Sequence, residues 1–330
     1  MKEYNIFNLD NKDPYEYVKS LEPLEIAYHG DADGVASAAL LMSIFEHTRD
    51  IKKFPYSPSH FGAYKEGNIA VDLGAPLFKE WNGLVIDHHE HPDNPSYPAI
   101  IGKIPAGVLI YELFKEYVPD NKRWLCVLSA VGDGQPEIIP NEIWDMYPEL
   151  WHMTGNIYKN RYGGLKGYPY PLYAKVSSPV NSLCRIGTPA KALDIVLRAN
   201  SVRDVIENPT AKLAQKEVSI EEARVLGDSN NPVTTEVIGN FNIVRYKSKF
   251  NIAGRIGANL SKGDRNSTYV IINDVTKESS VRGVMTLYLT EKLNEVGYLA
   301  GGHAGFGGIT LLPTQSTDEL VIDLRRILTK

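Results

Sequence analysis

The chain has 330 residues, and its net charge at pH 7 is −5. This length exceeds what one ordinary hydrophobic core supports and predicts two domains. The acidic balance argues against a broad basic surface that coats nucleic acid, although a catalytic cleft rich in carboxylates is itself acidic until cations fill it.

No apolar run approaches the roughly 18 residues that a membrane span needs, so we expect no membrane partner. The N-terminus is polar and acidic, without the basic-then-apolar order of a signal peptide. The two cysteines, Cys126 and Cys184, lie in apolar or small-residue stretches. We therefore expect a cytoplasmic protein with buried, reduced thiols.

The first half of the chain alternates short apolar runs with helical patterns, the order expected of a parallel α/β sheet. We expect strands at 24–29, 68–73 and 84–87 and helices at 35–47 and 104–118. The apolar segment 123–131 ends at Gly132-Asp133-Gly134. Residues 135–173, rich in aromatic residues, Gly and Pro, predict an irregular insertion or a helical cap.

The second half begins with two expected helices, at 189–199 and 205–226, and residues 228–232 interrupt the pattern. Further on, we expect strands at 234–246, 268–274 and 280–289 and a helix at 252–260. The predicted fold class is α/β with two domains. They are an N-terminal parallel-sheet domain at 1–204 and a smaller C-terminal α/β domain at 233–330, joined by a linker helix at 205–232.

Carboxylates and imidazoles recur at the expected strand ends, in four groups: His29-x-Asp31-x-Asp33, Asp72, Asp87-His88-His89 and Asp133. Parallel strands direct such groups toward one crevice. Singly, each has an ordinary explanation, such as an Asx turn that caps a helix. Together, the carboxylates would repel one another unless divalent cations offset their charge. Carboxylates mixed with imidazoles suit Mn²⁺, Mg²⁺ or Zn²⁺, and two such ions activate water and neutralise phosphate.

The ordered set HGDADG, VDLG, VIDHHEH and VGDG resembles the four motifs of the DHH phosphoesterase family. The stretch PVNSLCRIG resembles a segment of RecJ-type single-strand nucleases, and AGGHAGFGG resembles the GGH loop of the DHH-associated C-terminal domain. This resemblance covers residues 24–310. It implies two domains, with the metal site on the first and substrate-gripping residues on the second.

The resemblance also implies a role for each matching residue. It implies two divalent cations, with Mn²⁺ expected and Mg²⁺ the alternative, and a bridging role for Asp72. The ligands it implies are Asp31, Asp33, Asp72, His88 and Asp133. His29 stays open as a sixth ligand, because members with H-x-x-x-D-x-D use that histidine, whereas here only Gly30 separates it from the first aspartate.

Two further residues beside these ligands are implied to be catalytic. Asp87 would orient a histidine or support the metal through another ligand. His89 would face the scissile phosphate and donate to one of its oxygens or to the leaving group.

Substrate binding is implied for residues of both resembling segments. Guanidinium groups bind phosphate in a bidentate fork, and consecutive glycines let backbone amides approach an anion. The ordinary alternatives are plain surface arginines and a glycine-rich turn with a solvent-facing histidine. The residues concerned are Asn181, Arg185, Arg282, Gly301, Gly302 and His303.

The expected activity is metal-dependent hydrolysis of phosphodiester bonds, and the fold alone does not decide the substrate. The first hypothesis is a RecJ-like exonuclease on single-stranded DNA or RNA, although 330 residues leave no room for the extra nucleic-acid-binding domain of long bacterial RecJ proteins. The second is a phosphodiesterase for short oligonucleotides or cyclic dinucleotides. The third is a non-catalytic scaffold in a replication complex, which the complete carboxylate set disfavours. Expected partners are single-stranded nucleic acid or short oligonucleotides, and replication or repair proteins.

A pyrophosphatase is disfavoured by Asn181, by Arg185 and by the spacing at His29.

Overall fold

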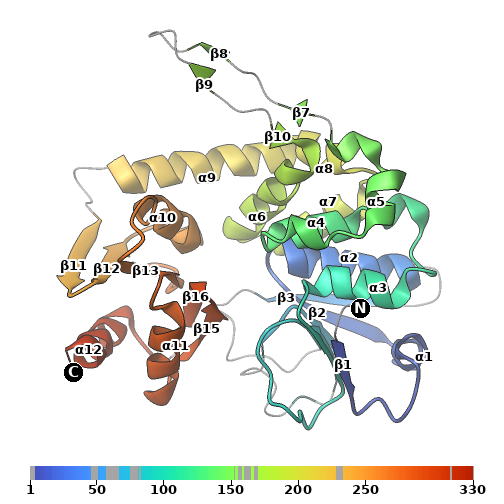
Figure 1. Cartoon of the computed structure of the whole chain (residues 1–330), viewed down its shortest axis with the longest axis horizontal. Coiled ribbons are helices and arrows are strands. Elements are labelled where there is room, and N and C mark those ends of the chain that lie inside the picture. Colours follow the sequence, from blue (N-terminus) through green and yellow to red (C-terminus); the bar gives the residue numbers. More distant parts are fainter. Residues whose placement is uncertain are drawn as a thin grey trace. The chain divides into compact units, whose positions relative to one another are not determined.

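The computed structural model describes residues 4–45, 51–56, 67–74, 81, 83–151, 153–154, 158–159, 165–166, 170–227, 233–312 and 314–329. Two compact α/β units make up the chain (Figure 1). The first comprises 1–55, 65–184 and 188–215, and the second comprises 56–64, 185–187 and 216–330. The predicted two-domain α/β class is confirmed, whereas the boundaries predicted at 205 and 232 stay a prediction. No helix in the described ranges is both long and apolar enough to cross a membrane.

The first unit is built on a six-stranded sheet with the order β1-β6-β5-β4-β2-β3. Strands β2, β4, β5 and β6 are parallel, and β1 runs antiparallel to β6. All residues of β4 and β5 are buried, which is typical of a parallel sheet covered on both faces. The strands are β1 (Tyr4–Phe7), β2 (Leu24–His29), β3 (Ile51–Tyr56), β4 (Ile69–Val71), β5 (Leu84–Asp87) and β6 (Ala99–Gly102).

Helices α2 (Ala32–Phe45) and α3 (Ala106–Phe114) pack against this sheet, as Figure 1 shows. Helices α4 (Leu125–Gly132) and α7 (Pro189–Arg198) pack against α2 in turn. Every residue of α2 except Ile44 is buried. A helix that is apolar on all sides is expected where neighbours cover it completely.

The remaining elements of the first unit are short. Four of them are the α-helices α1 (Pro14–Lys19), α5 (Asn141–Met146), α6 (Ser177–Arg185) and α8 (Val202–Glu207). Among the described residues, the 3-10 helices are Asp120–Lys122, Pro136–Ile138, Pro148–Trp151 and Leu172–Lys175. Two antiparallel pairs join β7 (Met153–Thr154) to β10 (Tyr170–Pro171) and β8 (Tyr158–Lys159) to β9 (Leu165–Lys166). The predicted insertion at 135–173 thus holds α5 and these pairs, and part of it lies outside the described residues.

The second unit holds another six-stranded sheet, with the order β11-β12-β13-β14-β16-β15. Among the strand pairs that the structure describes in this sheet, β12–β13 is the parallel one. The strands are β11 (Thr234–Ile238), β12 (Phe241–Tyr246), β13 (Thr268–Asn273), β14 (Ser279–Gly283), β15 (Leu299–His303) and β16 (Gly305–Thr310). Helix α9 (Pro209–Gly227) begins in the first unit and ends in the second.

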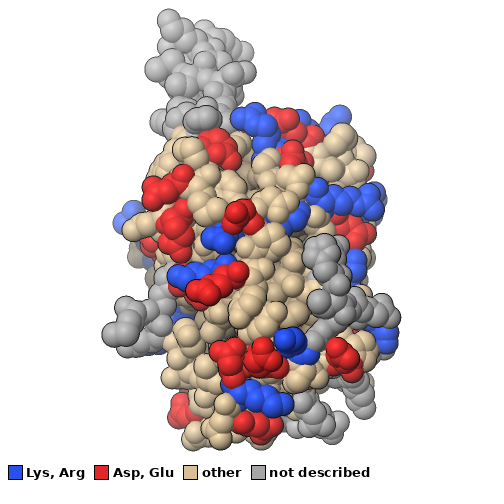
Figure 2. Space-filling view, turned by 90° about the vertical axis from the view of Figure 1, so that its right-hand side faces the viewer, with Lys and Arg blue, Asp and Glu red and all other residues tan. Residues whose placement is uncertain are grey.

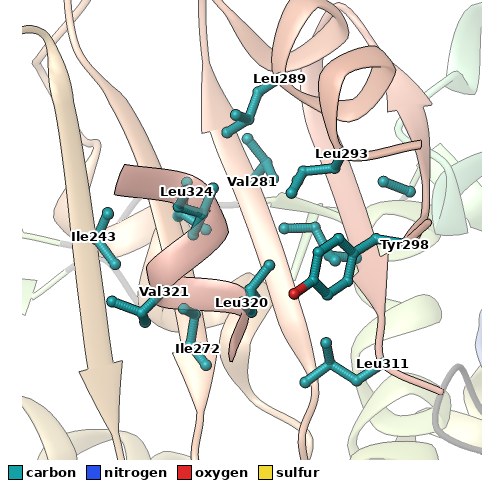
Figure 3. Packing of buried hydrophobic residues seen from close by; sticks show 13 residues of the cluster. Ile243, Ile272, Val281, Leu289, Leu293, Tyr298, Leu311, Leu320, Val321 and Leu324 are labelled. Carbon is teal, nitrogen blue, oxygen red and sulfur yellow. The ribbon is translucent and has the colours of Figure 1, made fainter. Parts of the chain in front are cut away.

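Helices cover both faces of this second sheet. Leu289 and Leu293 of α11 (Thr286–Glu295) and Leu320 of α12 (Thr317–Leu328) pack on one face (Figure 3). Residues of α9 and α10 (Ala253–Leu260) pack on the opposite face. Neighbouring residues Val270 and Ile271 of β13 belong to opposite cores, as the period of two in a strand requires.

Three differences from the sequence prediction have local causes. The helix predicted over 205–226 is two helices, because Asn208 accepts the amides of Thr210 and Ala211 and so caps a new helix. The strand predicted over 280–289 ends at Gly283, and α11 follows. The glycine-rich segment 300–308, predicted as a loop, forms the hairpin β15–β16.

We expect Leu289→Ala to lower the free energy of unfolding by about 2–5 kcal/mol, because it removes a fully buried side chain between α11 and the sheet. Leu287 on the same helix is 49% exposed and serves as the matched control. Chemical denaturation of both variants measures the difference. A loss of similar size in Leu287→Ala would contradict this assignment of the core.

Candidate metal centre

The first unit brings acidic and imidazole side chains to one edge of its sheet. The parallel register places the carboxyl ends of β2, β4 and β5 level with one another. His29, Asp72 and Asp87 occupy these ends. The convergence predicted for these three residues is therefore observed.

Two helix ends complete the cluster. Asp33 lies in the first turn of α2, and Asp133 is the C-cap of α4. The prediction that Asp133 follows a strand is wrong, because the segment before it is helical. A Cβ atom at Gly34 would lie 2.2 Å from the backbone oxygen of His29, and one at Gly132 would lie 2.9 Å from Cβ of Ala32. Both glycines are therefore required by close approach of the backbone.

His88 lies at the centre of three carboxylates. Its Nε2 atom is 3.0 Å from Asp133, 3.3 Å from Asp72 and 3.7 Å from Asp33. Its side chain is only 4% exposed, and the carboxylates come from three different elements. This spacing brings one imidazole and three carboxylates within reach of a common cation.

His29 lies in a second group of ligand atoms. Its Nδ1 atom is 2.9 Å from Asp31 and 3.4 Å from Asp72. Asp31 also accepts the backbone amide of Gly34, so the ordinary explanation, a cap on α2, applies to it as well.

Three overlapping groups of ligand atoms result. In each group the ligand atoms lie within 4.8 Å of one another. Asp72 belongs to two groups and His88 belongs to two. The groups are Asp72 with Asp87, His88 and His89; His29 with Asp31 and Asp72; and Asp33 with His88 and Asp133.

Asp72 has the features expected of a metal ligand. Its φ of +57° is in the left-handed region, which is strained for a residue other than glycine and is found preferentially at functional sites. The residue is 3% exposed, and its Oδ2 atom makes no well-formed hydrogen bond among the described residues, with Nδ1 of His29 3.4 Å away. A buried carboxylate oxygen that is so weakly paired is unfavourable in the protein alone, and a cation offsets it. The donor set therefore fits divalent metal.

Asp33 has a structural contact in addition to its place in the cluster. Its two carboxylate oxygens accept the backbone amides of Ala106 at 2.8 Å and Gly107 at 2.9 Å. These amides begin α3, whose N-cap, Pro105, makes no side-chain cap. The negative charge is favourable at that helix N-terminus.

The protonation of the cluster follows from its burial and its charges. Burial lowers the pKa of His88, but its hydrogen bonds with Asp133 and Asp72 outweigh this effect and raise the pKa to about 12. Burial and the Asp72 carboxylate raise the pKa of Asp33 to about 7, and burial with the Asp33 carboxylate raises that of Asp133 to about 6. Without cations the cluster therefore retains protons near neutral pH, and metal binding would displace them.

Asp87 connects His89 to a residue that the sequence analysis did not rank. Its two oxygens lie 2.8 Å from Nδ1 of His89 and 2.7 Å from Nε2 of His91. Nδ1 of His91 is in turn 2.8 Å from the hydroxyl of Tyr97. The HHEH spacing was the available signal, because it places His91 four residues after Asp87.

The predicted substrate residues are divided between the two units. Asn181 of α6 accepts the amide of Ala32 at 2.8 Å, so it lies at the start of α2 beside the cluster. Arg185 and Arg282 belong to the second unit. Gly301, Gly302 and His303 belong to β15, so the predicted GGH loop is part of a strand.

We expect His91→Phe to weaken Mn²⁺ binding by roughly ten- to a hundredfold, because His91 holds Asp87, a member of one ligand group, and residues that orient metal ligands typically have effects of this size. The variant keeps an aromatic ring in a site where the His91 side chain is 2% exposed, but removes both hydrogen bonds. Titration calorimetry with Mn²⁺ measures the change. Exposed Glu90, changed to Gln, is the control. Equal affinities in wild type and His91→Phe would make His91 a packing residue only.

Comparison of the structure with solved structures identifies the fold of this chain. No family model matches the sequence, and no curated protein does. RecJ from Thermus thermophilus in complex with Mn²⁺ is similar in structure, with a TM-score of 0.62 and 12% identity over 96% of this chain and 53% of that one. The chain thus spans about half the length of the Thermus protein.

Two further solved structures are similar. An exonuclease RecJ bound to manganese has a TM-score of 0.60 and 12% identity over 96% of this chain and 91% of that one. CDC45 from Entamoeba histolytica has a TM-score of 0.53 and 7% identity over 95% and 96%. At such identities the similarity concerns the fold. The chain has a RecJ-like fold.

Proposed function

We propose that this protein is a two-metal phosphodiester hydrolase, a RecJ-like exonuclease on single-stranded DNA or RNA. The observation that carries the proposal is the set of three overlapping ligand groups, in which Asp72 and His88 are shared. Sharing of one carboxylate between adjacent ions is the arrangement that two-metal hydrolysis uses. The solved RecJ structures with Mn²⁺ and Mg²⁺ have the same fold and support the assignment.

The ligand atoms suggest how the cations would be held. His29, Asp31 and Asp72 would hold one ion, and Asp33, Asp72, His88 and Asp133 would hold the other, so that Asp72 is common to both sets. When bound, the ions supply an activated water and positive charge beside the phosphate. The imidazoles favour Mn²⁺, because Mg²⁺ prefers ligand sets made of oxygen alone.

His89 and its partners would act on the substrate directly. Asp87 holds Nδ1 of His89 and thereby fixes the orientation of the ring. The side chain of His89 is 33% exposed, so a substrate can reach it. We propose that Nε2 of His89 donates to a phosphate oxygen or to the leaving group, with His91 holding Asp87 in place.

The nucleic-acid contacts would be local. On the described part of the face shown in Figure 2, acidic and basic side chains are intermixed, and neither sign forms one continuous area. This agrees with the net charge of −5. Binding would therefore depend on the metal cluster and on a few cations such as Arg185 and Arg282, and less on a broad basic surface.

Two alternative functions make different demands on this structure. A phosphodiesterase for short oligonucleotides or cyclic dinucleotides would use the same cluster. A scaffold without catalysis would need the fold alone, and CDC45 from Entamoeba histolytica has this fold. The complete set of carboxylates and imidazoles favours an enzyme.

We expect end-labelled single strands to be shortened progressively from one end with Mn²⁺ and not in excess EDTA. Asp72→Asn should lower the rate more than about tenfold, because metal-site stabilisation is worth several kcal/mol. Asparagine tolerates the left-handed backbone at this position, so the fold should persist. Mn²⁺ should raise the melting temperature of the wild type and not of this variant.

Asp93→Asn, an exposed neighbour of the cluster motif, is the matched control and should behave as wild type. Cleavage of dinucleotides alone would select the oligonucleotide phosphodiesterase. Full activity in EDTA would contradict the metal centre, and Mn²⁺ stabilisation without any cleavage would favour the scaffold.

Arg282→Ala should raise the Michaelis constant by roughly ten- to two-hundredfold, because a charge-assisted phosphate contact contributes about 1.5–3 kcal/mol. Turnover should change less, provided that the contact is equal in ground and transition states. Exposed Arg265 of the same unit, changed to Ala, is the control. The measurements are the steady-state kinetics and the metal content of both variants and the wild type. An unchanged Michaelis constant would remove Arg282 from substrate binding, and lost metal would move it to the metal site.

A further inference from the structure

Three short helices of the first unit bring aromatic rings together at its surface. Trp144 lies on α5, which Figure 1 labels, Trp151 ends the 3-10 helix Pro148–Trp151, and Tyr173 lies on the 3-10 helix Leu172–Lys175. The centroids of the two indole rings are 4.7 Å apart. The ring of Tyr173 meets both indoles edge-on, with its centroid 5.2 Å from one and 5.4 Å from the other. We call these three residues the aromatic cluster.

The aromatic cluster is not the core of these three helices. Each helix is anchored by an aliphatic side chain that is almost fully buried, namely Ile143, Leu150 and Leu172. Trp151, by contrast, is 54% exposed, and the other two rings are half-buried. Single exposed apolar residues are normal, but clustered Trp and Tyr side chains are characteristic of binding surfaces. The exposed part of the aromatic cluster is therefore a candidate interaction surface.

The surroundings of the aromatic cluster are acidic. The two helices that carry the tryptophans also carry Glu142 and Asp145, which are exposed, and Glu149, which is half-buried. None of these three carboxylates makes an ion pair or a side-chain hydrogen bond in the part of the chain that the structure describes. Residues 124–158 contain no Lys or Arg, and Lys175 is the one cation that ends the third helix. Carboxylates thus outnumber cations on these helices, which favours a cationic ligand.

A second exposed aromatic stack of the same unit provides a comparison. Tyr117 is 50% exposed and stacks on Tyr15, with ring centroids 3.7 Å apart. Lys19 lies over the Tyr15 ring, with its Nζ atom 5.8 Å from the centroid. No Lys or Arg of the described residues lies over a ring of the aromatic cluster. The Tyr15 stack therefore has a cation from its own helix, whereas a cation for the aromatic cluster would come from outside.

We propose that the aromatic cluster is a docking surface for a basic, arginine-bearing segment of a partner protein. A guanidinium stacks on an indole ring and also pairs with carboxylates in a bidentate fork, so one side chain satisfies both features of the surface. An ammonium pairs with the carboxylates but does not stack in the same way. A single-stranded nucleic acid would stack on the rings, but its phosphates would meet the carboxylates.

This surface is separate from the proposed catalysis. None of its residues belongs to a group of potential metal ligands among the described residues. Docking of a partner segment here requires neither bound metal nor cleavage, so the proposal goes beyond the proposed function and can fail or succeed without it.

The test uses two fluorescein-labelled peptides of equal length and charge, one of alternating glycine and arginine and one of alternating glycine and lysine. Fluorescence anisotropy measures their binding to the full chain in Mn²⁺, so that the carboxylates of the metal centre do not compete. Wild type should bind the arginine peptide more tightly than the lysine peptide. Trp151→Ala should weaken binding of the arginine peptide roughly two- to thirtyfold, the range of a cation–π contact, and Trp151→Phe should weaken it less.

The acidic side chains have their own variant. Asp145→Asn combined with Glu149→Gln should weaken binding of both peptides and make it less dependent on salt concentration, because two of the attracting charges are removed. A binding constant and a salt dependence equal to those of wild type would contradict the acidic part of the surface.

Tyr117→Ala is the matched control, because it removes an exposed ring of the same unit that has its own cation, and it should bind as wild type does. Thermal unfolding with and without Mn²⁺ verifies that each variant keeps its fold and its response to metal. Equal binding of the arginine peptide by wild type and Trp151→Ala would overturn the proposal. So would equal binding of the two peptides by wild type, or tighter binding of an oligothymidylate that depends on Trp151.

Discussion

The carboxylates of Asp33, Asp72 and Asp133 surround a single atom, Nε2 of His88. In a buried site each carboxylate raises the pKa of the others, so the cluster persists only where positive charge is supplied. The imidazole of His88, which follows strand β5, supplies part of it. Gly34 lets the start of α2 approach His29, and Gly132 lets the end of α4 approach Ala32. Packing in the first unit thus follows from where the charge must lie.

The second unit uses charge in the opposite way. Arg282 is half-buried with one carboxylate nearby, Glu278, whose pKa is raised to about 7 by burial. Burial also lowers the pKa of Arg282, which the Glu278 charge opposes. A guanidinium keeps its charge in such a place, because its pKa in water is far above neutrality. The first unit therefore concentrates carboxylates in its metal-ligand cluster, whereas the second unit keeps a cation, Arg282, beside Glu278.

Much of the first unit could be predicted because its signals are local. Short apolar runs before Asp72 and Asp87 identify buried strands, and the aspartates follow at their ends. The element that ends at Asp133 was harder to predict. The segment LCVLSAVG is almost entirely apolar, and such a run does not distinguish a strand from a buried helix. His91 was missed because its partner Tyr97 is defined only by the folded loop. Glycine is uncommon in strands, so the sequence of β15 does not predict a strand. The segment forms a strand through its pairing with β16, which the sequence does not show.

The contacts of Asp33 have a consequence for how substitutions in this cluster are interpreted. Replacement of an aspartate by asparagine is usually a nearly isosteric removal of charge. At Asp33 both oxygens accept backbone amides, so an asparagine would present its own NH₂ group to one of these donors. The substitution would also destabilise the N-terminus of α3, because one of its amides would lose its acceptor. At Asp133 no such amide is present among the described contacts, and the same replacement changes charge with less effect on the fold. The same aspartate-to-asparagine substitution therefore tests charge and helix stability together at Asp33, but mainly charge at Asp133.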